Sequence, residues 1–182
     1  MTDNNKKFRL VTRSDFDGLV CAMLLKKLNI IGDIKFVHPA DMQDGSIPIT
    51  DSDITTNLPY VPGAHLVFDH HSSEADRVTT SGDYTLDAPP DNYILNTEAP
   101  SAARVVYDYY GGKKALPDIQ DGLMEAVDKS DSAQLSREEI LNPTGWILLN
   151  YLMDSRTGLG RFREFRLSNY QLMLHLIEYC RE

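Results

Sequence analysis

Residues 8–28, FRLVTRSDFDGLVCAMLLKKL, decide the fold. The run FRLVT at 8–12 contains aromatic and β-branched residues and predicts a buried strand. A Ser-Asp-Phe-Asp-Gly turn follows, and residues 19–28 then carry apolar side chains at helical spacing. The stretch therefore predicts a strand, a short polar loop and a helix, which is the unit that builds parallel α/β sheets.

Three more runs with strand character follow before residue 70. They are residues 33–38, residues 54–58 and the run HLVFD at 65–69. Their apolar positions do not alternate strictly with polar ones, which is typical of strands buried on both faces of a sheet. The expected fold is an α/β domain in which a parallel, Rossmann-like sheet lies between helices in three αβα layers.

The rest of the chain is predicted to be mainly helical. Residues 72–100 contain few apolar periods and predict a long irregular loop with one strand at 93–95. A cap-like serine and a glycine pair bound the helical segment SAARVVYDYYGG. Further helices are expected at 118–129, 143–153 and 167–179.

Composition and charge exclude several classes of protein. The net charge of −9 disfavours the broad basic groove of a duplex-binding protein, although divalent cations can still bridge an acidic protein to a phosphate. Cys21 and Cys180 lie far apart in apolar helical patterns and indicate neither a disulfide framework nor a zinc site. No apolar run reaches the roughly 18 residues of a membrane span, and no signal peptide is visible. A cytoplasmic location is expected.

Asp15 and Asp17 lie between the first strand and its helix, two residues apart. Both carboxylates can turn toward one point, and Gly18 permits a tight backbone path beside them. Such a pair suits a hard divalent cation. A helix cap is the alternative interpretation for either aspartate.

Asp69, His70 and His71 directly follow the apolar run LVF. Three ionisable residues at a strand end are costly unless something uses them. Because successive side chains point in different directions, one histidine can bind a metal while the next faces a substrate. Histidine is also a usable general acid near neutral pH. The alternative is a surface histidine pair.

Asp128 and Asp131 form a third acidic pair at the end of a predicted helix. Alone, this pair indicates no more than a solvated helix end. Arg104, on the helix that follows the long loop, could reach a substrate phosphate, or it could pair with Asp108 one helical turn away.

These motifs resemble those of the DHH phosphoesterase superfamily, which has an aspartate pair after the first strand, a DHH triplet after a later strand and a further aspartate beyond a helical segment. The resemblance covers nearly the whole chain. Within the superfamily, the similarity is to exopolyphosphatase-related and nanoRNase-like proteins. The segments that carry it are NLPYVPG at 57–63, FDHHSSE at 68–74, PSAARVVYDYYGG at 100–112 and MDSRTGLGRFREFRLSNYQL at 153–172.

The resemblance implies a phosphoesterase with one or two Mn²⁺ ions, Mg²⁺ being the other candidate. Five residues would ligate metal: Asp15, Asp17, Asp69, His70 and Asp131. The resemblance places His71 in a substrate-facing, proton-donating role, and it assigns catalytic roles to His71, Asp69 and Asp131. His71 and Arg104 are the expected substrate-binding residues.

Two positions depart from the family pattern. Val11 stands where many members carry a histidine ligand, and Asn57 stands where an aspartate often bridges both metals. A neutral amide bridges two cations poorly. The substitutions leave open a single-metal enzyme, a weak enzyme or a module that binds without catalysing.

The resemblance also predicts the domain organisation. Residues 1–155 would form the DHH catalytic domain, and residues 156–182 would form a linker helix toward a C-terminal substrate-binding domain that this sequence does not contain. The expected substrate is a small phosphorylated molecule, such as a short single-stranded oligonucleotide, a cyclic dinucleotide or a nucleoside bisphosphate. Exopolyphosphatase activity and a catalytically impaired nucleotide- or phosphate-binding module are the alternatives. Neither duplex DNA nor a membrane is an expected partner, and a homodimer is left open.

Overall fold

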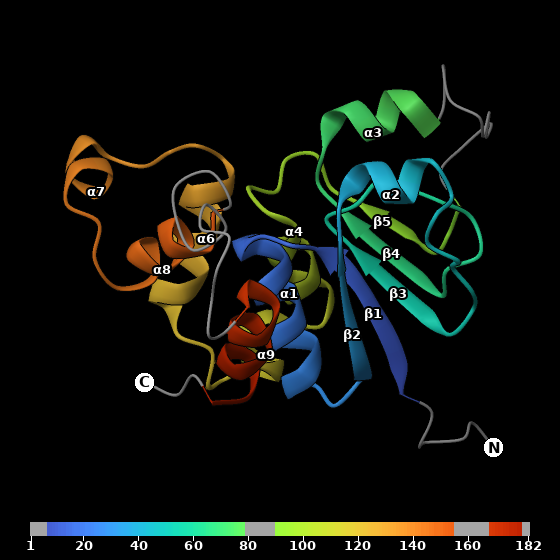
Figure 1. The fold of residues 1–182 in the computed structure, drawn as a ribbon, viewed down its shortest axis with the longest axis horizontal. Coiled ribbons are helices and arrows are strands. Elements are labelled where there is room, and N and C mark those ends of the chain that lie inside the picture. Colours follow the sequence, from blue (N-terminus) through green and yellow to red (C-terminus); the bar gives the residue numbers. More distant parts are fainter. Residues whose placement is uncertain (1–6, 79–89, 155–167, 180–182) are drawn as a thin grey trace.

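A parallel sheet forms the centre of the protein in the computed structural model, which describes residues 7–78, 90–154 and 168–179 (Figure 1). Five strands pair in the order β2-β1-β3-β4-β5, and every neighbouring pair is parallel. The strands are β1 (Phe8–Arg13), β2 (Ile31–Val37), β3 (Asp53–Thr56), β4 (Leu66–Asp69) and β5 (Tyr93–Leu95). The prediction of a parallel three-layer α/β fold is confirmed.

Helices cover the sheet and extend beyond it (Figure 1). In the described part of the chain they are α1 (Phe16–Lys27), α2 (Pro39–Gln43), α3 (Ser72–Asp76), α4 (Ala102–Tyr109), α5 (Gly112–Ala115), α6 (Asp121–Asp131), α7 (Arg137–Leu141), α8 (Gly145–Met153) and α9 (Asn169–Tyr179). α1 packs against α4 and α9, and α6 packs against α8.

Both faces of the sheet are buried, as the apolar runs predict. Leu10, Ile54 and Phe68 point to one face and join the core formed with α1, α4 and α6. Their neighbours Val11 and Val67 point to the other face, where they belong to two smaller apolar clusters. Alternation of side chains along each strand thus supplies both faces with apolar residues.

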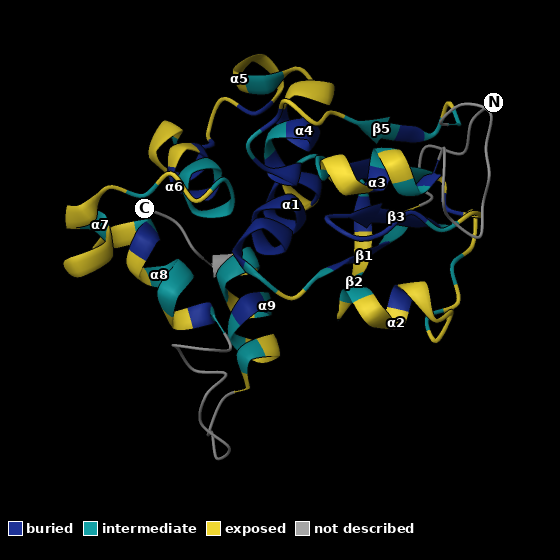
Figure 2. Cartoon of the chain, turned by 90° about the horizontal axis from the view of Figure 1, so that it is seen from above, coloured by how far each residue is buried: buried dark blue, intermediate teal, exposed yellow. Residues whose placement is uncertain are grey.

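α1 is the buried helix of the domain, and Figure 2 shows it enclosed along most of its length. Ten of its residues, from Phe16 to Leu25, are buried. At its start, a Cβ added to Gly18 would lie only 2.0 Å from the carbonyl oxygen of Arg13. The helix therefore begins in direct contact with the end of β1, and only glycine fits at this position.

Four short helices were not expected from the sequence. α2 and α3 fall within segments expected to be loops, and α5 and α7 fall between the expected helices. Each has four or five residues, which is too short to show an apolar period of 3.6. The strand expected at 93–95 is present as β5, and residues 79–89 of the expected long loop lie outside the described residues.

The described part of the expected linker helix packs onto the domain. α9 lies against α1, and Met173 in α9 is fully buried in the same core as α1. Residues 156–167 lie outside the described part. None of the described helices is long and apolar enough to cross a bilayer.

Candidate active site

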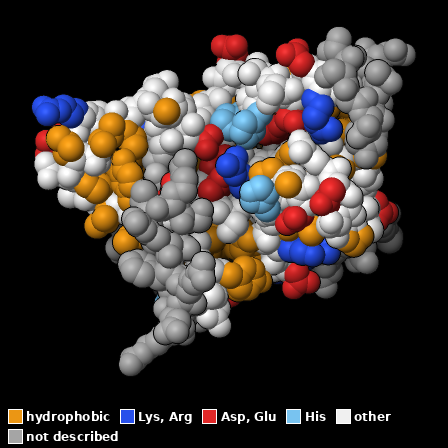
Figure 3. Space-filling model, turned by 45° about the horizontal axis from the view of Figure 1, so that its top comes forward, with side chains coloured by type: hydrophobic (Ala, Val, Ile, Leu, Met, Phe, Trp, Pro, Cys, Tyr) orange, Lys and Arg blue, Asp and Glu red, His pale blue; other side chains and the backbone are white. Residues whose placement is uncertain are grey.

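Side chains from the ends of β1 and β4 and from α6 line a common cavity of about 750 Å³. Figure 3 shows histidine, acidic and basic side chains gathered around a hollow on this face. The sequence-predicted residues that line the cavity are Asp15, Asp17, His70, His71 and Asp131. Carboxyl ends of parallel strands meet at one edge of a sheet, which is where open α/β folds bind ligands.

Asp17 is buried at the base of this site, with 2% of its surface exposed. Its carboxylate accepts hydrogen bonds from the backbone N–H groups of Ala102 (3.0 Å) and Ala103 (2.8 Å) at the start of α4. Burial raises the pKa of Asp17 well above its usual range, as do the nearby charges of Asp131 and Asp15, while the Ala103 N–H opposes them. Asp17 therefore also has a structural role, because it links α1 to α4, two helices far apart in sequence.

His70 lies between a backbone carbonyl and Asp131. Its Nδ1 lies 3.1 Å from the carbonyl oxygen of Ala99, which can only accept, so this nitrogen carries the proton. Its Nε2 lies 2.8 Å from Asp131 Oδ2 but is buried without an aligned hydrogen bond. Burial, the largest influence, lowers the pKa of His70, but Asp131 and Asp17 outweigh it and raise the pKa to about 9.

Asp17, His70 and Asp131 together fit a divalent cation. Each offers one ligand atom, and these atoms lie within 4.8 Å of one another. Two carboxylate oxygens and one imidazole nitrogen form a donor set that suits Mn²⁺ and similar ions. The unaligned Nε2 of His70 is the nitrogen a cation would use, and the Ala99 carbonyl holds the ring in the matching tautomer. The carboxylates of Asp131 and Asp17 beside His70 give this point a negative charge that favours a cation.

Asp15 lies beside this cluster, but N–H groups surround its carboxylate. Gly18 N–H donates to Oδ1 at 2.9 Å, and the Asn57 amide lies 3.2 Å from Oδ1 and 3.4 Å from Oδ2. Arg13 Nε lies 2.8 Å from Oδ2. Although nearly a third of the Asp15 side chain is exposed, desolvation raises its pKa, and the Gly18 N–H and Arg13 oppose that shift.

Asp69 lies behind His71 and does not line the cavity. It is fully buried, its Oδ1 lies 2.7 Å from His71 Nδ1, and the Tyr93 hydroxyl lies 3.4 Å from its Oδ2. Burial and the Asp69 charge raise the pKa of Tyr93. The sequence predicts Asp69 as a metal ligand, whereas the structure engages both of its oxygens with neighbouring side chains. The contact leaves Nε2 of His71 as the ring nitrogen available to a ligand.

Arg104 and Asp128 are paired with each other outside the cavity. Arg104 Nε donates to Asp128 Oδ2 at 3.0 Å, and Nη2 makes a second, shorter contact with the same oxygen. Ser101, the N-cap of α4, donates to Asp128 Oδ1 at 2.8 Å. The guanidinium therefore ties α4 to α6, and its ion-pair partner is Asp128 rather than Asp108.

The structure also places residues in the cavity that sequence reasoning missed. Arg13 ends β1 and His38 directly follows β2, and both line the cavity. The rule that points to Asp15, the convergence of strand ends, applies equally to them. Asn150 and Asn169 also line it, but helix packing far along the chain brings them there, and no sequence signal marks them.

Comparisons with known proteins relate the chain to a solved structure. No family model matches the chain, and no curated protein sequence does. Among solved structures, the chain is similar to the pGpG-specific phosphodiesterase PggH from Vibrio cholerae, with 57% sequence identity and a TM-score of 0.82. The match covers 96% of this chain and 52% of the other, so the chain spans about half the length of that protein.

This match supports a DHH-like phosphoesterase and does not bear on the exopolyphosphatase-related branch. The aligned region includes nearly all of the domain that holds the cavity, the acidic cluster and the histidine pair. In sequence and in fold, over almost its whole length, the chain is therefore similar to a phosphodiesterase.

Proposed function

We propose that this chain is the catalytic unit of a divalent-cation-dependent phosphodiesterase that hydrolyses short oligonucleotides, with the linear dinucleotide pGpG as the first substrate to test. The observation that carries the proposal is the cluster of Asp17, His70 and Asp131 at the cavity, with His71 beside it. The likeness to a pGpG-specific phosphodiesterase supports the choice of substrate and ranks it ahead of polyphosphate. The cavity volume of about 750 Å³ suits a small ligand.

Asp17, His70 and Asp131 would hold the cation, for which Mn²⁺ is the expected ion. A cation at this position supplies Lewis acidity to a phosphoryl oxygen of the substrate. The protein contributes the fixed geometry of the ligands, because Asp17 is anchored to the start of α4 and His70 to the Ala99 carbonyl. An acidic protein can then receive an anionic substrate at this one point.

His71 would protonate the leaving oxygen. The oxygen of a water molecule forms a bond to phosphorus as the ester P–O bond breaks, the leaving oxygen takes a proton from His71, and the proton that the attacking water loses restores the protonated ring. Asp69 accepts from Nδ1 of His71, so the protonated ring donates from Nε2. Complete hydrolysis of pGpG by this reaction yields two molecules of GMP.

The direct test is hydrolysis of pGpG by the purified chain. GMP release is measured by chromatography with Mn²⁺, with Mg²⁺ and with EDTA. The expected result is turnover with Mn²⁺, loss of turnover in EDTA, and loss in the Asp131→Asn variant. An absence of turnover on pGpG and other dinucleotides with every cation tested would contradict the proposal.

The role of His71 has its own test, based on the leaving group. Replacing His71 with Asn is expected to slow pGpG hydrolysis by about 10²–10⁴-fold. The same variant should retain far more of its activity on a p-nitrophenyl ester of a nucleotide, because p-nitrophenolate leaves without a proton. An equal loss on both substrates would contradict proton donation by His71.

The second candidate function is a module that binds nucleotides without hydrolysing them. The residues Val11 and Asn57, which stand where ligands are expected, favour this candidate. Val11 is fully buried in an apolar cluster, so no ligand atom comes from that position. Asn57 presents its amide N–H group to Asp15. Tight binding of pGpG with no release of GMP under any cation would establish this alternative.

A further inference from the structure

Among the described residues that line the cavity, Arg13 is a positively charged side chain that the proposed mechanism does not use. It ends β1, lines the cavity and has 43% of its side chain exposed. We infer that Arg13 binds a phosphate group of the substrate, and that Asp15 and Asn57 position its guanidinium instead of holding a second cation. This inference rests on the proposed function, because it assigns a phosphate contact in the same cavity.

The contacts of Asp15 support the positioning role. Both carboxylate oxygens face nitrogen groups: Gly18 N–H at 2.9 Å, the Asn57 amide at 3.2–3.4 Å and Arg13 Nε at 2.8 Å. A carboxylate only accepts hydrogen bonds, so Asn57 must present its NH₂ group there. An NH₂ group cannot ligate a cation. Both oxygens of Asp15 are therefore already in contact with the protein's own nitrogen groups.

The guanidinium of Arg13 remains available to a ligand. A guanidinium carries five N–H donors in a planar fork that matches the geometry of phosphate oxygens. Asp15 contacts the guanidinium at Nε, and in the described part of the chain no hydrogen bond engages the N–H groups of its two Nη atoms. Asp15 thus holds the guanidinium at the cavity through Nε and leaves the Nη donors to the substrate.

A purely structural role does not account for this arrangement. Half-exposed ion pairs add little to stability, because water and salt screen the two charges. The remaining contacts of Asp15, with Gly18 and Asn57, already cap α1 and join it to the end of β3. Arg13 lies in the cavity, two residues from the carboxylate that fixes it. Binding of a negatively charged ligand explains this arrangement.

The first experiment measures pGpG binding by titration calorimetry with Mn²⁺ present. All proteins carry His71→Asn, so that the substrate is consumed only slowly during the titration. Adding Arg13→Met is expected to weaken binding by about 10–100-fold, the effect of losing hydrogen bonds to a charged group. Arg13→Lys should recover only part of the loss, because an ammonium lacks the planar fork.

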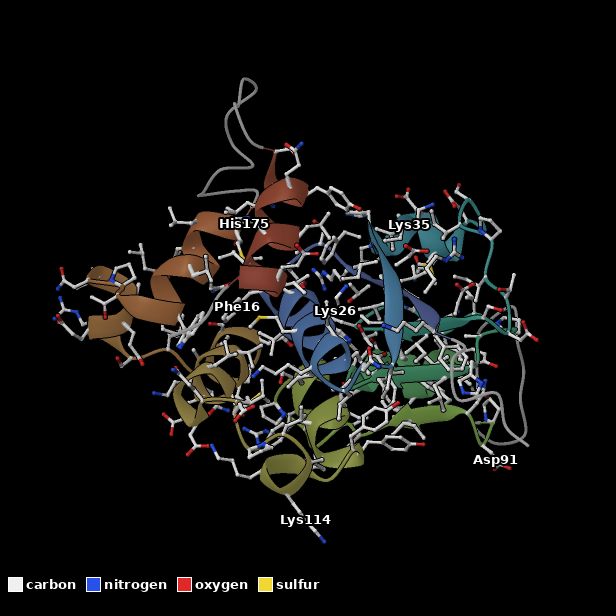
Figure 4. All side chains as sticks on the ribbon, turned by 90° about the horizontal axis from the view of Figure 1, so that it is seen from below. Phe16, Lys26, Lys35, Asp91, Lys114 and His175 are labelled. Carbon is white, nitrogen blue, oxygen red and sulfur yellow. The ribbon has the colours of Figure 1, made fainter. Side chains whose placement is uncertain are left out.

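The matched control is Lys114→Met, which removes the same charge from an exposed position on α5. Figure 4 shows this side chain pointing away from the body of the protein. It should bind pGpG within about twofold of the parent, because exposed charges beyond a Debye length are largely screened. Thermal unfolding of every variant checks that the fold is intact, and Arg13→Lys carries the test if Arg13→Met does not fold.

The second experiment counts Mn²⁺ ions by titration without substrate. One ion per chain is expected for the unaltered protein and for Asp15→Asn, with affinities within about threefold. Two ions per chain that fall to one in Asp15→Asn would overturn the positioning role of Asp15.

The outcomes separate this inference from the function it rests on. Equal pGpG affinities with and without Arg13 would overturn the phosphate contact and leave the proposed function standing. Failure of the unaltered chain to bind or hydrolyse pGpG, together with failure of the His71→Asn protein to bind it, would contradict both.

Discussion

Oδ1 of Asp69 lies 2.7 Å from Nδ1 of His71, and this contact fixes the imidazole with its other nitrogen toward the cavity. Replacing Asp69 with Asn should lower kcat for pGpG by about 10²–10⁴-fold, because the ring loses the acceptor that orients it. Tyr93→Phe is the control, since it removes only a 3.4 Å contact on the opposite carboxylate oxygen. Mn²⁺ affinity should change by less than about threefold in Asp69→Asn. A much larger loss would support the sequence prediction that Asp69 ligates metal.

Binding of Mn²⁺ should stabilise the protein through Asp131. At a Mn²⁺ concentration of about 100 Kd, linkage adds about 2.7 kcal/mol, which for a chain of this size raises Tm by roughly 5–10 °C. Asp131→Asn should abolish most of the shift, as measured by thermal unfolding with and without Mn²⁺. Asp121→Asn, at the other end of α6, has a carboxylate 81% exposed and should keep the full shift. An equal shift in both variants would rule out Asp131 as a ligand.

Asn57→Asp should enable the protein to bind a second cation. The new carboxylate would lie where the amide now stands, 3.2–3.4 Å from the oxygens of Asp15, and the two negative charges would repel. We expect a loss of about 1–3 kcal/mol of stability in EDTA, measured by urea unfolding, and a gain of one Mn²⁺ per chain, measured by calorimetry. An unchanged Mn²⁺ stoichiometry would contradict the assignment of Asn57 to the position of a bridging aspartate.

Gly18→Ala should prevent normal folding, because its Cβ would lie 2.0 Å from the carbonyl oxygen of Arg13 and 2.8 Å from Oγ1 of Thr12. We expect a loss of more than about 3 kcal/mol in urea unfolding, since neither β1 nor α1 can move without disturbing the core. Gly122→Ala in α6 has nothing within 4 Å of the added Cβ and should be neutral or slightly stabilising. A Gly18→Ala protein as stable as the parent would contradict the close contact between β1 and α1.

Asp53 gives a pH dependence of stability at the other end of the sheet. Burial raises the pKa of Asp53. Arg9, whose Nε lies 2.6 Å away, and the Thr50 N–H lower this pKa by a larger amount, so the net shift is downward. The stabilisation by this carboxylate is therefore complete above its unfolded pKa of about 4 and is lost as the pH falls through its lower folded pKa.

Asp53→Asn should accordingly be less stable than the parent by about 1–3 kcal/mol at pH 7. The difference should stay constant down to about pH 5 and shrink below about pH 4, as measured by urea unfolding across this range. A difference that grows toward low pH would contradict the downward shift.

The ends of the strands could be predicted from the sequence. Most of the predicted site residues that line the cavity follow from these strand ends. Asp15, Asp17, His70 and His71 follow predicted strands, and the geometry of a parallel sheet brings such residues together. Asp131 carries no such local signal, since it ends a helix, and only the likeness to a family pointed to it. The architecture was predictable for the same reason as the strand ends, because apolar runs without strict alternation are typical of a covered parallel sheet.

The division of roles among these residues could not be predicted, because it depends on contacts between distant segments. Asp17 binds the start of α4, 85 positions further along the chain. Arg104 pairs with Asp128 on α6, and Asp69 contacts Nδ1 of His71. Charge pairs of this kind leave no periodic trace in the sequence. The short helix α7 left a different kind of sequence signal, because Ser136 and Glu139 form a capping box.

The two duties of Asp17 affect how an inactive form of this protein should be made. Its carboxylate anchors the first turn of α4 through Ala102 and Ala103, so removing it disturbs the architecture together with the chemistry. An inactive protein altered at that position would not distinguish a lost reaction from a damaged scaffold. Asp131 and His71 are partly exposed at the cavity and make no such backbone anchor, so substrate-trapping variants for crystallography are better built there.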